Sequence, residues 1–382
     1  MTKKPSYRFA GYTEPWEQRK LGECTEISAG GDIEKSKLLN NGKYPVIANA
    51  LTSDGIVGYY NDSYRIEAPA VTVTGRGDVG VAKARNVNFT PVVRLLSLKS
   101  EHDVIFLENA INTQKIVIES TGVPQLTAPQ LGRYKIFFPS LPEQTAIGSF
   151  FQDIDQLISL QQRKLEVLKE QKKTYLKLIF PAKGQTKPAL RFAGFEDEWK
   201  EVKLGEVLKK NNKKNRDLAI NNVESVSNKL GFVKQTEQFE DYSVASADLS
   251  NYYVISEKQF AYNPSRINVG SIAYKKEGDT LSVVSPLYVS FSTVENIDDS
   301  YLWYWFKTSL FDSQRAIYSE GGVRDTLSFN QLSDIELIFP SLPEQEAIGS
   351  FFQDLEKAIA KQEEKVNQLK ESKQTLLRKM FI

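Results

Sequence analysis

The side chains that most often carry out catalysis or bind transition metals are scarce in this chain. Cys24 is the only cysteine and His102 the only histidine among 382 residues. A structural zinc site needs about four ligands, mostly Cys and His, and a Cys–His nucleophile pair needs a third group to orient the histidine. The composition therefore argues against both kinds of site, and we expect His102 to be a surface loop residue.

Three short patterns resemble catalytic or cofactor motifs but lack the right surroundings. Gly75–Gly80 fits G-x-G-x-x-G, yet the residues after it predict a strand, whereas a dinucleotide site needs a helix there. Asn263–Arg266 lacks the second proline and the aromatic residue of the amino-methyltransferase motif, and Glu201–Lys203 reads as part of an amphipathic strand. We expect a hairpin turn at Gly75–Gly80, no catalytic residue and no metal site.

The overall composition predicts a soluble globular protein of two or three domains. Hydrophobic residues make up 41% and charged residues 25%, and mean hydropathy is -0.38. No apolar run is long enough to span a membrane, and one cysteine fits a reducing compartment, so we expect a cytoplasmic protein with no membrane partner. The net charge is only +1, so any binding of nucleic acid must rely on local positive patches.

The chain contains an internal sequence repeat. The motif Phe9-Ala10-Gly11-Tyr12, with Trp16 and Leu21-Gly22-Glu23 after it, recurs from Phe192 onward. The block Phe138–Asp153 recurs as Phe339–Asp354 with one change, Thr145 to Glu346. Between these landmarks, segments 24–135 and 207–336 share little sequence beyond a weak echo of RGDVG in RINVG. The sequence therefore predicts two dissimilar units on a common, pseudo-twofold frame.

The dissimilar segments read as strand-rich units of mixed α+β class. Residues 69–75, 80–87 and 282–291 contain β-branched or alternating runs typical of strands, and residues 301–317 predict an aromatic-rich helix packed on the second sheet.

Each repeated block leads into a heptad helix. In the first helix, Ser140 is a candidate N-cap and Pro142 suits a first turn, and we expect the helix to reach about Phe180 with a break near Gly148. Heptad positions along the two helices include Ile158, Gln161, Leu165, Leu168 and Lys172 in the first, and Ile359, Gln362, Val366, Leu369 and Lys373 in the second.

The polar heptad positions indicate the orientation of the pair. A parallel pair would place Lys172 beside Lys373, whereas an antiparallel pair places Lys172 against Gln362 and Gln161 against Lys373. The same register places Leu165 with Leu369, Leu168 with Val366, and Ile158 with Leu376. We therefore predict an antiparallel coiled coil; the alternative is that each helix packs only on its own unit.

The two LPEQ-x-AI blocks that lead into heptad helices, with the FAG and LGE openings, resemble the specificity (S) subunit of type I restriction–modification systems. The resemblance covers essentially the whole chain. It implies a first target-recognition domain at 1–141, a spacer helix at 142–182, a second recognition domain at 183–342 and a second spacer helix at 343–382. Each domain would read one half of an asymmetric, split site in double-stranded DNA.

The resemblance also implies the division of labour among subunits. The helices would dock two modification subunits that methylate adenine with S-adenosylmethionine. Restriction subunits would add ATP- and Mg-dependent translocation and cleavage. No cofactor is expected on this chain.

Candidate DNA contacts follow only from residue type and loop position. Arg and Lys can read guanine, Asn and Gln can read adenine, and all of them can hold phosphate. The candidates are Thr74, Arg76, Lys83 and Arg85 in the first unit, and Asn263, Ser265, Arg266, Lys275 and Lys276 in the second. For each of them a solvated surface role or a structural role remains open.

Two other classes of protein remain as alternatives. An interaction scaffold would tether two partners without binding DNA, and an enzyme would show activity as an isolated chain. Retention of specific DNA by the purified complex separates the first alternative from a recognition subunit.

Overall fold

The computed structural model describes residues 2–3, 5–116, 124–228, 230–235, 248–319 and 326–381. The chain divides into two compact units, of which unit 1 comprises residues 1–163 and 363–382 and unit 2 comprises residues 164–362. Each unit is a strand-rich body with helices, so the mixed α+β class is confirmed. In the described part of the chain, no helix combines the length and the apolar character needed to cross a bilayer.

Unit 1 is framed by residues from both ends of its globular part. Strand β2 (Trp16–Lys20) pairs antiparallel with β10 (Lys135–Phe138), and β1 (Thr2–Lys3) pairs with the other edge of β2. The short helix α1 (Leu21–Cys24) follows β2 directly, and α3 (Ala128–Gly132) precedes β10. A Cβ on Gly22 would lie 3.2 Å from the Cα of Gly132, so these helices approach at their glycines.

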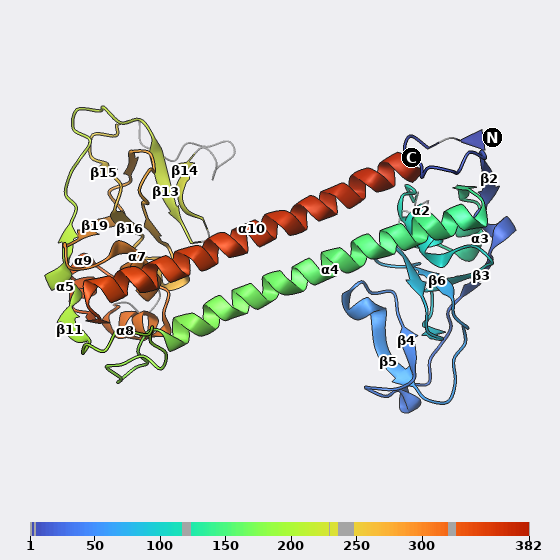
Figure 1. Ribbon diagram of the computed structural model, residues 1–382, viewed down its shortest axis with the longest axis horizontal. Coiled ribbons are helices and arrows are strands. Elements are labelled where there is room, and N and C mark those ends of the chain that lie inside the picture. Colours follow the sequence, from blue (N-terminus) through green and yellow to red (C-terminus); the bar gives the residue numbers. More distant parts are fainter. Residues whose placement is uncertain are drawn as a thin grey trace. The chain divides into compact units, whose positions relative to one another are not determined.

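Two further sheets and one helix complete the globular part of unit 1 (Figure 1). The first has the order β3-β9-β6-β7 and the second the order β5-β4-β8. The strands are β3 (Glu26–Ala29), β4 (Tyr44–Ile47), β5 (Ile56–Tyr60), β6 (Ala70–Val73), β7 (Ala82–Arg85), β8 (Thr90–Pro91) and β9 (Leu96–Lys99), with 3-10 turns η1 (Lys35–Lys37) and η2 (Thr52–Gly55). Helix α2 (Val104–Asn112) packs on β6 and β7 and buries Phe106, Leu107 and Ile111.

Unit 2 repeats this frame around different sheets. Strand β11 (Lys200–Lys203) pairs antiparallel with β20 (Glu336–Phe339), flanked by α5 (Leu204–Val207) and α9 (Phe329–Ser333). The sheets have the orders β12-β19-β16-β17 and β14-β13-β18-β15. Their strands are β12 (Leu208–Lys210), β13 (Val223–Ser227), β14 (Gly231–Lys234), β15 (Tyr253–Ile255), β16 (Gln259–Tyr262), β17 (Ile272–Tyr274), β18 (Ser282–Val284) and β19 (Val289–Thr293), with the 3-10 turn η3 (Ile267–Val269) after β16.

The aromatic segment predicted as one helix forms two. Helix α7 (Asp299–Trp305) and helix α8 (Ser309–Tyr318) are separated at Phe306–Thr308. The Thr308 side chain accepts a hydrogen bond from the backbone N–H of Phe311, which starts α8 as an N-cap. The break lets Trp305, Phe306 and Phe311 pack together in the core of unit 2.

The two repeated blocks begin the long helices α4 (Leu141–Leu178) and α10 (Leu342–Phe381). The expected break near Gly148 is wrong, because α4 continues through it. A Cβ at Gly148 would lie 2.3 Å from Oδ1 of Asp103, the residue that caps α2, and at Gly349 it would lie 2.8 Å from Oδ1 of Asp298, which caps α7. The lack of a side chain at both glycines lets the N-terminus of a neighbouring helix, α2 or α7, lie close to the long helix.

Within unit 1 the parts of α4 and α10 that belong to it run antiparallel. The ring of Phe151 lies 6.1 Å from that of Phe381, and the Lys373 ammonium bonds to the Asp155 carboxylate at 2.6 Å. Moving along the pair, residue numbers increase in α4 while those of the contacting residues decrease in α10, so the two helices run in opposite directions. Ile158 is buried here, at 8% exposure, as its heptad position predicts.

Within unit 2 the corresponding parts also run antiparallel. The rings of Tyr175 and Phe351 lie 5.2 Å apart, and the Lys172 ammonium bonds to the Glu356 carboxylate at 2.5 Å. Glu356 also accepts from Lys307 at 3.4 Å. The antiparallel prediction is thus confirmed in each unit.

Carboxylates that the heptad pattern did not predict bind the two interface lysines, while the predicted pairings Lys172–Gln362 and Gln161–Lys373 stay predictions. Lys172 and Lys373 lie in the interface with 23% and 20% of their side chains exposed, and each binds an acidic residue of the opposite helix. An ammonium that is partly removed from water gains more from a carboxylate than from a neutral amide. The predicted layers Leu165–Leu369, Leu168–Val366 and Ile158–Leu376 stay predictions.

The helix ends are built into the cores of the units. Ile179 and Phe180, just after α4, belong to the core of unit 2, where Phe180 lies 5.3 Å from Tyr301. Met380 and Phe381, at the end of α10, belong to the core of unit 1, where Phe381 lies 6.2 Å from Trp16. Unit 1 therefore needs the last turns of the chain to complete its core.

The repeated landmarks bind each other within each unit. The carboxylate of Glu143 is fully buried and accepts from Arg8, and that of Glu344 accepts from Arg191. The amides of Gln144 and Gln345 donate to the carbonyls of Pro139 and Pro340 at 2.9 and 3.0 Å. The Glu and Gln of the LPEQ motif therefore stabilise the fold in both copies.

Candidate nucleic-acid interface

The glycine-rich motif of unit 1 is the turn of the β6–β7 hairpin, as expected. The backbone φ angles of Gly77 and Gly80 are 75° and 89°, which side-chain-bearing residues rarely adopt. Thr74 is 5% exposed, and its hydroxyl accepts from the Val81 N–H at 3.0 Å and donates to the Asp78 carbonyl. Thr74 therefore shapes the turn, and its hydroxyl is not available to a nucleic acid.

Arg76 lies at the exposed tip of this turn. Its backbone pairs with Gln125, which fixes the tip against the chain that enters α3. Within the described residues its guanidinium has no hydrogen bond or ion pair. A held backbone with a free guanidinium suits an arginine that binds phosphate or a guanine edge.

The other two candidates of unit 1 are partly engaged by η2. Lys83 is half exposed and its ammonium bonds to the Asp54 carboxylate. Arg85 donates to the Thr72 hydroxyl and to the Asp54 carbonyl, both at 3.0 Å. Partial burial lowers the pKa of Arg85. Lys83 can reach a ligand by giving up an exposed ion pair of small energy, whereas Arg85 is tied to the sheet.

In unit 2 the loop after β16 presents a short polar segment. The Asn263 side chain accepts from the Ser265 N–H at 3.0 Å, and its backbone carbonyl accepts from the Arg266 N–H at 3.0 Å. Gly270, with φ of 82°, ends η3 and turns the chain into β17. Ser265 and Arg266 are exposed on this braced loop, and the Arg266 guanidinium has no partner within the described residues.

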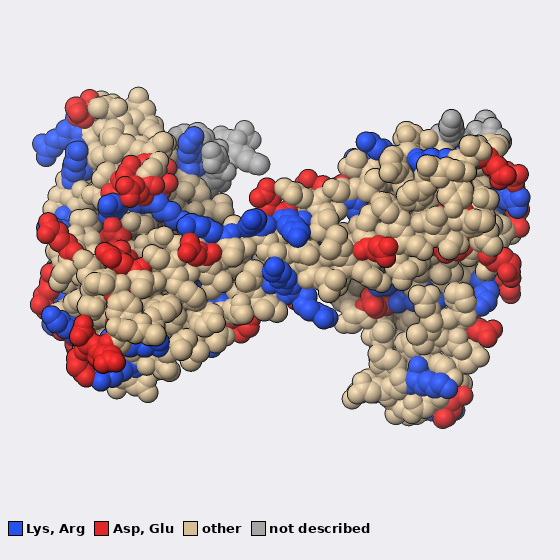
Figure 2. Space-filling model, in the orientation of Figure 1, with Lys and Arg blue, Asp and Glu red and all other residues tan. Residues whose placement is uncertain are grey.

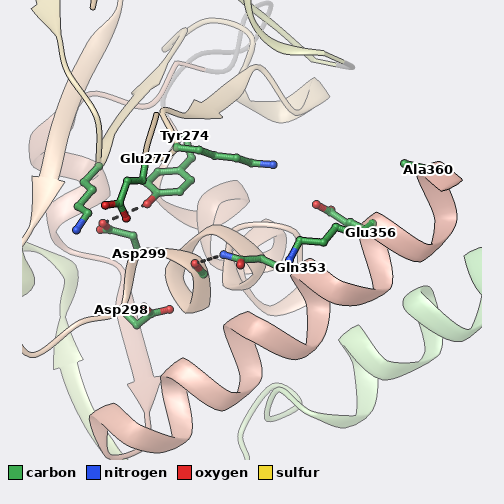
Figure 3. Close-up of a pocket in the computed structure, with 11 residues that line it drawn as sticks. Tyr274, Glu277, Asp298, Asp299, Gln353, Glu356 and Ala360 are labelled. Atoms are coloured by element: carbon green, nitrogen blue, oxygen red, sulfur yellow. Dashed lines mark hydrogen bonds between the residues drawn. The ribbon is translucent and has the colours of Figure 1, made fainter. Parts of the chain in front are cut away.

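Lys275 and Lys276 point to different environments. Lys275 is 1% exposed, and its ammonium bonds to Glu224 at 2.5 Å and to Ser282 at 2.9 Å inside the sheets. From this position it cannot meet a nucleic acid, because the core encloses it. Lys276 is exposed and lines a cavity of about 660 Å³ in unit 2 (Figure 3).

That cavity carries charges of both signs. Tyr274 donates to the Asp299 carboxylate at 3.3 Å, and Gln353 donates to Ser300 at 2.5 Å (Figure 3). Burial raises the pKa of Asp299. Because Asp298, Asp299, Glu277 and Glu356 share the lining with three lysines, the interior of the cavity does not suit a phosphate. Lys276, which is exposed, is therefore a candidate contact only outside the cavity.

Two exposed cations that sequence reasoning missed lie beside the candidates. The Arg94 carbonyl would lie 2.1 Å from a Cβ on Gly75, so Arg94 adjoins the turn that carries Arg76. Lys258 donates its backbone N–H to the carbonyl of Lys275, the residue before Lys276, at 2.8 Å. No local pattern indicates either neighbour, because both are created by sheet pairing.

Over the visible faces of both units, Lys and Arg alternate with Asp and Glu (Figure 2). This agrees with the net charge of +1. Among the described residues, no group of three or more His, Cys, Asp or Glu side chains is placed to hold a metal ion.

A family model described as the type I restriction modification DNA specificity domain matches residues 13–170 and 196–371. The chain belongs to this family. The two matched stretches are the two repeats, each ending in one of the long helices. The specificity subunit is the non-catalytic component of type I restriction–modification enzymes.

Similarity to single proteins agrees with the family. A type I specificity subunit of Mycoplasma pneumoniae is 28% identical over 144 residues, which cover 36% of this chain and 39% of that protein. The MjaVIII specificity subunit of Methanocaldococcus jannaschii is 21% identical over 95% of this chain and 91% of its own length. The chain thus spans well under half of the first relative and nearly all of the second.

A solved structure shows the same fold. The type I restriction–modification S subunit from M. genitalium superposes with a TM-score of 0.65 at 15% identity, covering 100% of this chain and 99% of that one.

Proposed function

We propose that this chain recognises DNA as the specificity subunit of a type I restriction–modification complex, with each unit reading one half of an asymmetric, split site. The duplicated frame carries this proposal: two units share β-strand frames and helices but differ in the sheets between them. Shared frames suit a common assembly, and different sheets suit two different half-site sequences.

The DNA contacts proposed for unit 1 are Arg76 and Lys83, with Arg94 added as a neighbour. Those proposed for unit 2 are Asn263, Ser265, Arg266 and Lys276. Thr74, Arg85 and Lys275 are left out because their polar atoms are bound within the fold.

The long helices set the spacing of the half-sites and dock two modification subunits. A helical segment of about 26 residues spans roughly 40 Å, and adjacent half-sites on one face of DNA lie about 34–36 Å apart. The modification subunits would supply adenine methylation with S-adenosylmethionine. Restriction subunits would supply ATP- and Mg-dependent translocation and cleavage, and the complex would act in the cytoplasm.

Replacing residues 24–135 with the same segment of another such subunit tests the modular part of the proposal. Methylome sequencing should show one half-site changed and the other kept. Alteration of both half-sites, or of neither, contradicts the assignment of one half-site to each unit.

A paired insertion tests the spacing. Four residues added near Leu165 and four near Val366 extend each helix by about 6 Å, slightly more than one turn, so the heptad pattern is almost kept. The half-site sequences should remain, and the spacer should grow by one or two base pairs at about 3.4 Å each. An unchanged spacer in a stable, active complex would show that the helices do not set it.

A further inference from the structure

Each unit contains a pocket at the start of its long helix, built from the duplicated block. In unit 1 the pocket is about 330 Å³ and includes Phe138, Leu141 and Gln144. In unit 2 it is about 540 Å³ and includes Phe339, Leu342 and Gln345, the same block positions. The two pockets are therefore one feature made twice.

The same hydrogen bonds shape both pockets. The Gln144 oxygen accepts from the Asp103 N–H at 3.3 Å, and the Gln345 oxygen accepts from the Asp298 N–H at 2.9 Å. These bonds hold the loop before α2 or α7 against the first turn of the long helix. Each pocket wall is thus fixed by a buried amide and is not an accident of loose loops.

An exposed leucine stands at the rim of each pocket without a structural reason. Leu141 is 50% exposed and Leu342 is 36% exposed. The glutamate and glutamine of the block are explained by buried bonds, but an exposed leucine at a helix start contributes little to folding. Its presence in both copies, in units that otherwise differ, indicates a common partner for both positions.

The charge around each pocket is the same although the residues differ. Three carboxylates and one cation line the first pocket, Glu14, Glu17 and Glu101 with Arg19, which gives 1 − 3 = −2. The second has Asp197, Glu198 and Glu295 with Lys200, again 1 − 3 = −2. This sign repels DNA phosphate and attracts a basic protein segment.

Two carboxylates at each pocket are free for a partner. Glu17 binds Arg19 at 2.6 Å and Glu198 binds Lys187 at 2.5 Å. Within the described residues, no ion pair engages the carboxylates of Glu14 and Glu101 at the first pocket, or of Asp197 and Glu295 at the second.

We infer that each pocket docks the same segment of a partner protein, an apolar side chain next to Lys or Arg, so that two copies of one partner bind, one to each unit. The inference rests on the proposed function, in which that two-copy partner is the modification subunit. The apolar side chain covers Leu141 or Leu342, and the basic residue meets the free carboxylates.

The test uses the full chain and the modification subunit of its own system, without DNA. Native mass spectrometry gives the number of bound copies, and calorimetry gives the Kd of each. Leu141→Ser should weaken one copy by about tenfold to a hundredfold and leave the other, Leu342→Ser should do the same for the second, and the double variant should lose both. Leu51→Ser and Leu287→Ser, at leucines that are 53% and 79% exposed outside the pockets, are the matched controls and should keep both copies.

Charge reversal gives a second readout. Glu101→Lys and Glu295→Lys should weaken one copy each, and the effect should shrink as salt is raised, because both carboxylates are exposed. Glu257→Lys, an exposed carboxylate elsewhere in unit 2, should have no effect. Melting curves of all variants should match the parent chain.

The outcomes separate the two proposals. If the parent chain binds two copies and the leucine and charge variants bind both within twofold, the pocket inference is overturned and the proposed function stands. If the parent chain binds no modification subunit, the proposed function fails and the pocket inference with it.

Discussion

The guanidinium of Arg8 donates two hydrogen bonds, of 2.7 and 2.6 Å, to the carboxylate of Glu143, which is fully buried. Arg191 and Glu344 form the same pair in unit 2, with both bonds at 2.7 Å. In each unit this pair ties the segment before β2 or β11 to the first turn of the long helix. It joins the two landmarks by which the repeat is detected in the sequence.

Glu143→Gln should destabilise unit 1 by about 3 kcal/mol, because loss of one partner leaves a charge without its counter-charge in a closed environment. Denaturant unfolding of the full chain, followed by a probe in unit 1, measures the change. Glu26→Gln, at an exposed carboxylate of the same unit, is the control and should shift the midpoint little. Equal effects of the two substitutions would contradict a special role for the pair.

The two interhelical ion pairs should differ in strength. Lys172–Glu356 has side-chain exposures of 23% and 28%, whereas Lys373–Asp155 has 20% and 46%, so water screens the second more. Double-mutant cycles with Lys→Met and carboxylate→amide changes should give a coupling of about 1–2 kcal/mol for the first and under about 1 kcal/mol for the second. The reverse order would show that exposure does not govern these pairs.

Gly148→Ala should cost about 1–3 kcal/mol although alanine favours helices, because its Cβ would lie 2.3 Å from Oδ1 of Asp103. The Asp103 carboxylate would have to leave the N–H groups of Ile105 and Phe106, which it caps. Ser149→Ala, at the next and exposed position of α4, is the matched control and should be neutral or slightly stabilising. A stabilising Gly148→Ala would disprove the close approach.

Substitutions at Arg76 and at Lys275 should have different effects, the first on DNA affinity and the second on the stability of unit 2. Arg76→Ala should weaken binding of the specific site by about 1–3 kcal/mol and leave unfolding unchanged if Arg76 reads a base. Lys275→Met should lower the stability of unit 2, because it strands the buried carboxylate of Glu224, and should keep the half-site preference. DNA binding at fixed salt and denaturant unfolding, run on both variants, decide the assignment. Unaltered affinity and specificity in Arg76→Ala would remove that residue from the interface.

His102 should make unit 1 sensitive to acid. Its ring stacks on Phe138 at 4.3 Å between centroids, and burial lowers its pKa, so it is more enclosed than the surface loop residue we expected. Because the pKa of His102 is lower in the folded state, folding favours the neutral ring. The contribution of His102 to the free energy of unfolding is therefore complete above about pH 6.5 and is lost as the pH falls toward the folded-state pKa. His102→Asn should therefore flatten the fall in stability between pH 7 and pH 5. An identical fall in both proteins would mean that His102 does not contribute.

Much of the architecture could be predicted from the sequence because it depends on local periodicity and on identity between repeats. The heptads predicted two long helices, and the lysines at matching heptad positions predicted the antiparallel orientation that both units show. The strand after Gly80 predicted a hairpin turn and removed a dinucleotide site from consideration. The near absence of His and Cys made a recognition role more plausible than catalysis.

Only the tertiary structure decided which polar residues are free. Lys275 and Lys276 are neighbours just after β17, yet one lies in the core and the other in solvent. The backbone of Lys275 still bonds to Lys258 and Gln259 at the edge of the sheet, whereas the chain turns away from Lys276 onward. The partners of Lys172 and Lys373, the bond between Arg8 and Glu143, and the use of Gly148 for a close contact all join residues far apart along the chain. Periodicity fixes which face of an element is apolar, but the partner of a buried charge depends on packing between distant segments, which no local pattern encodes.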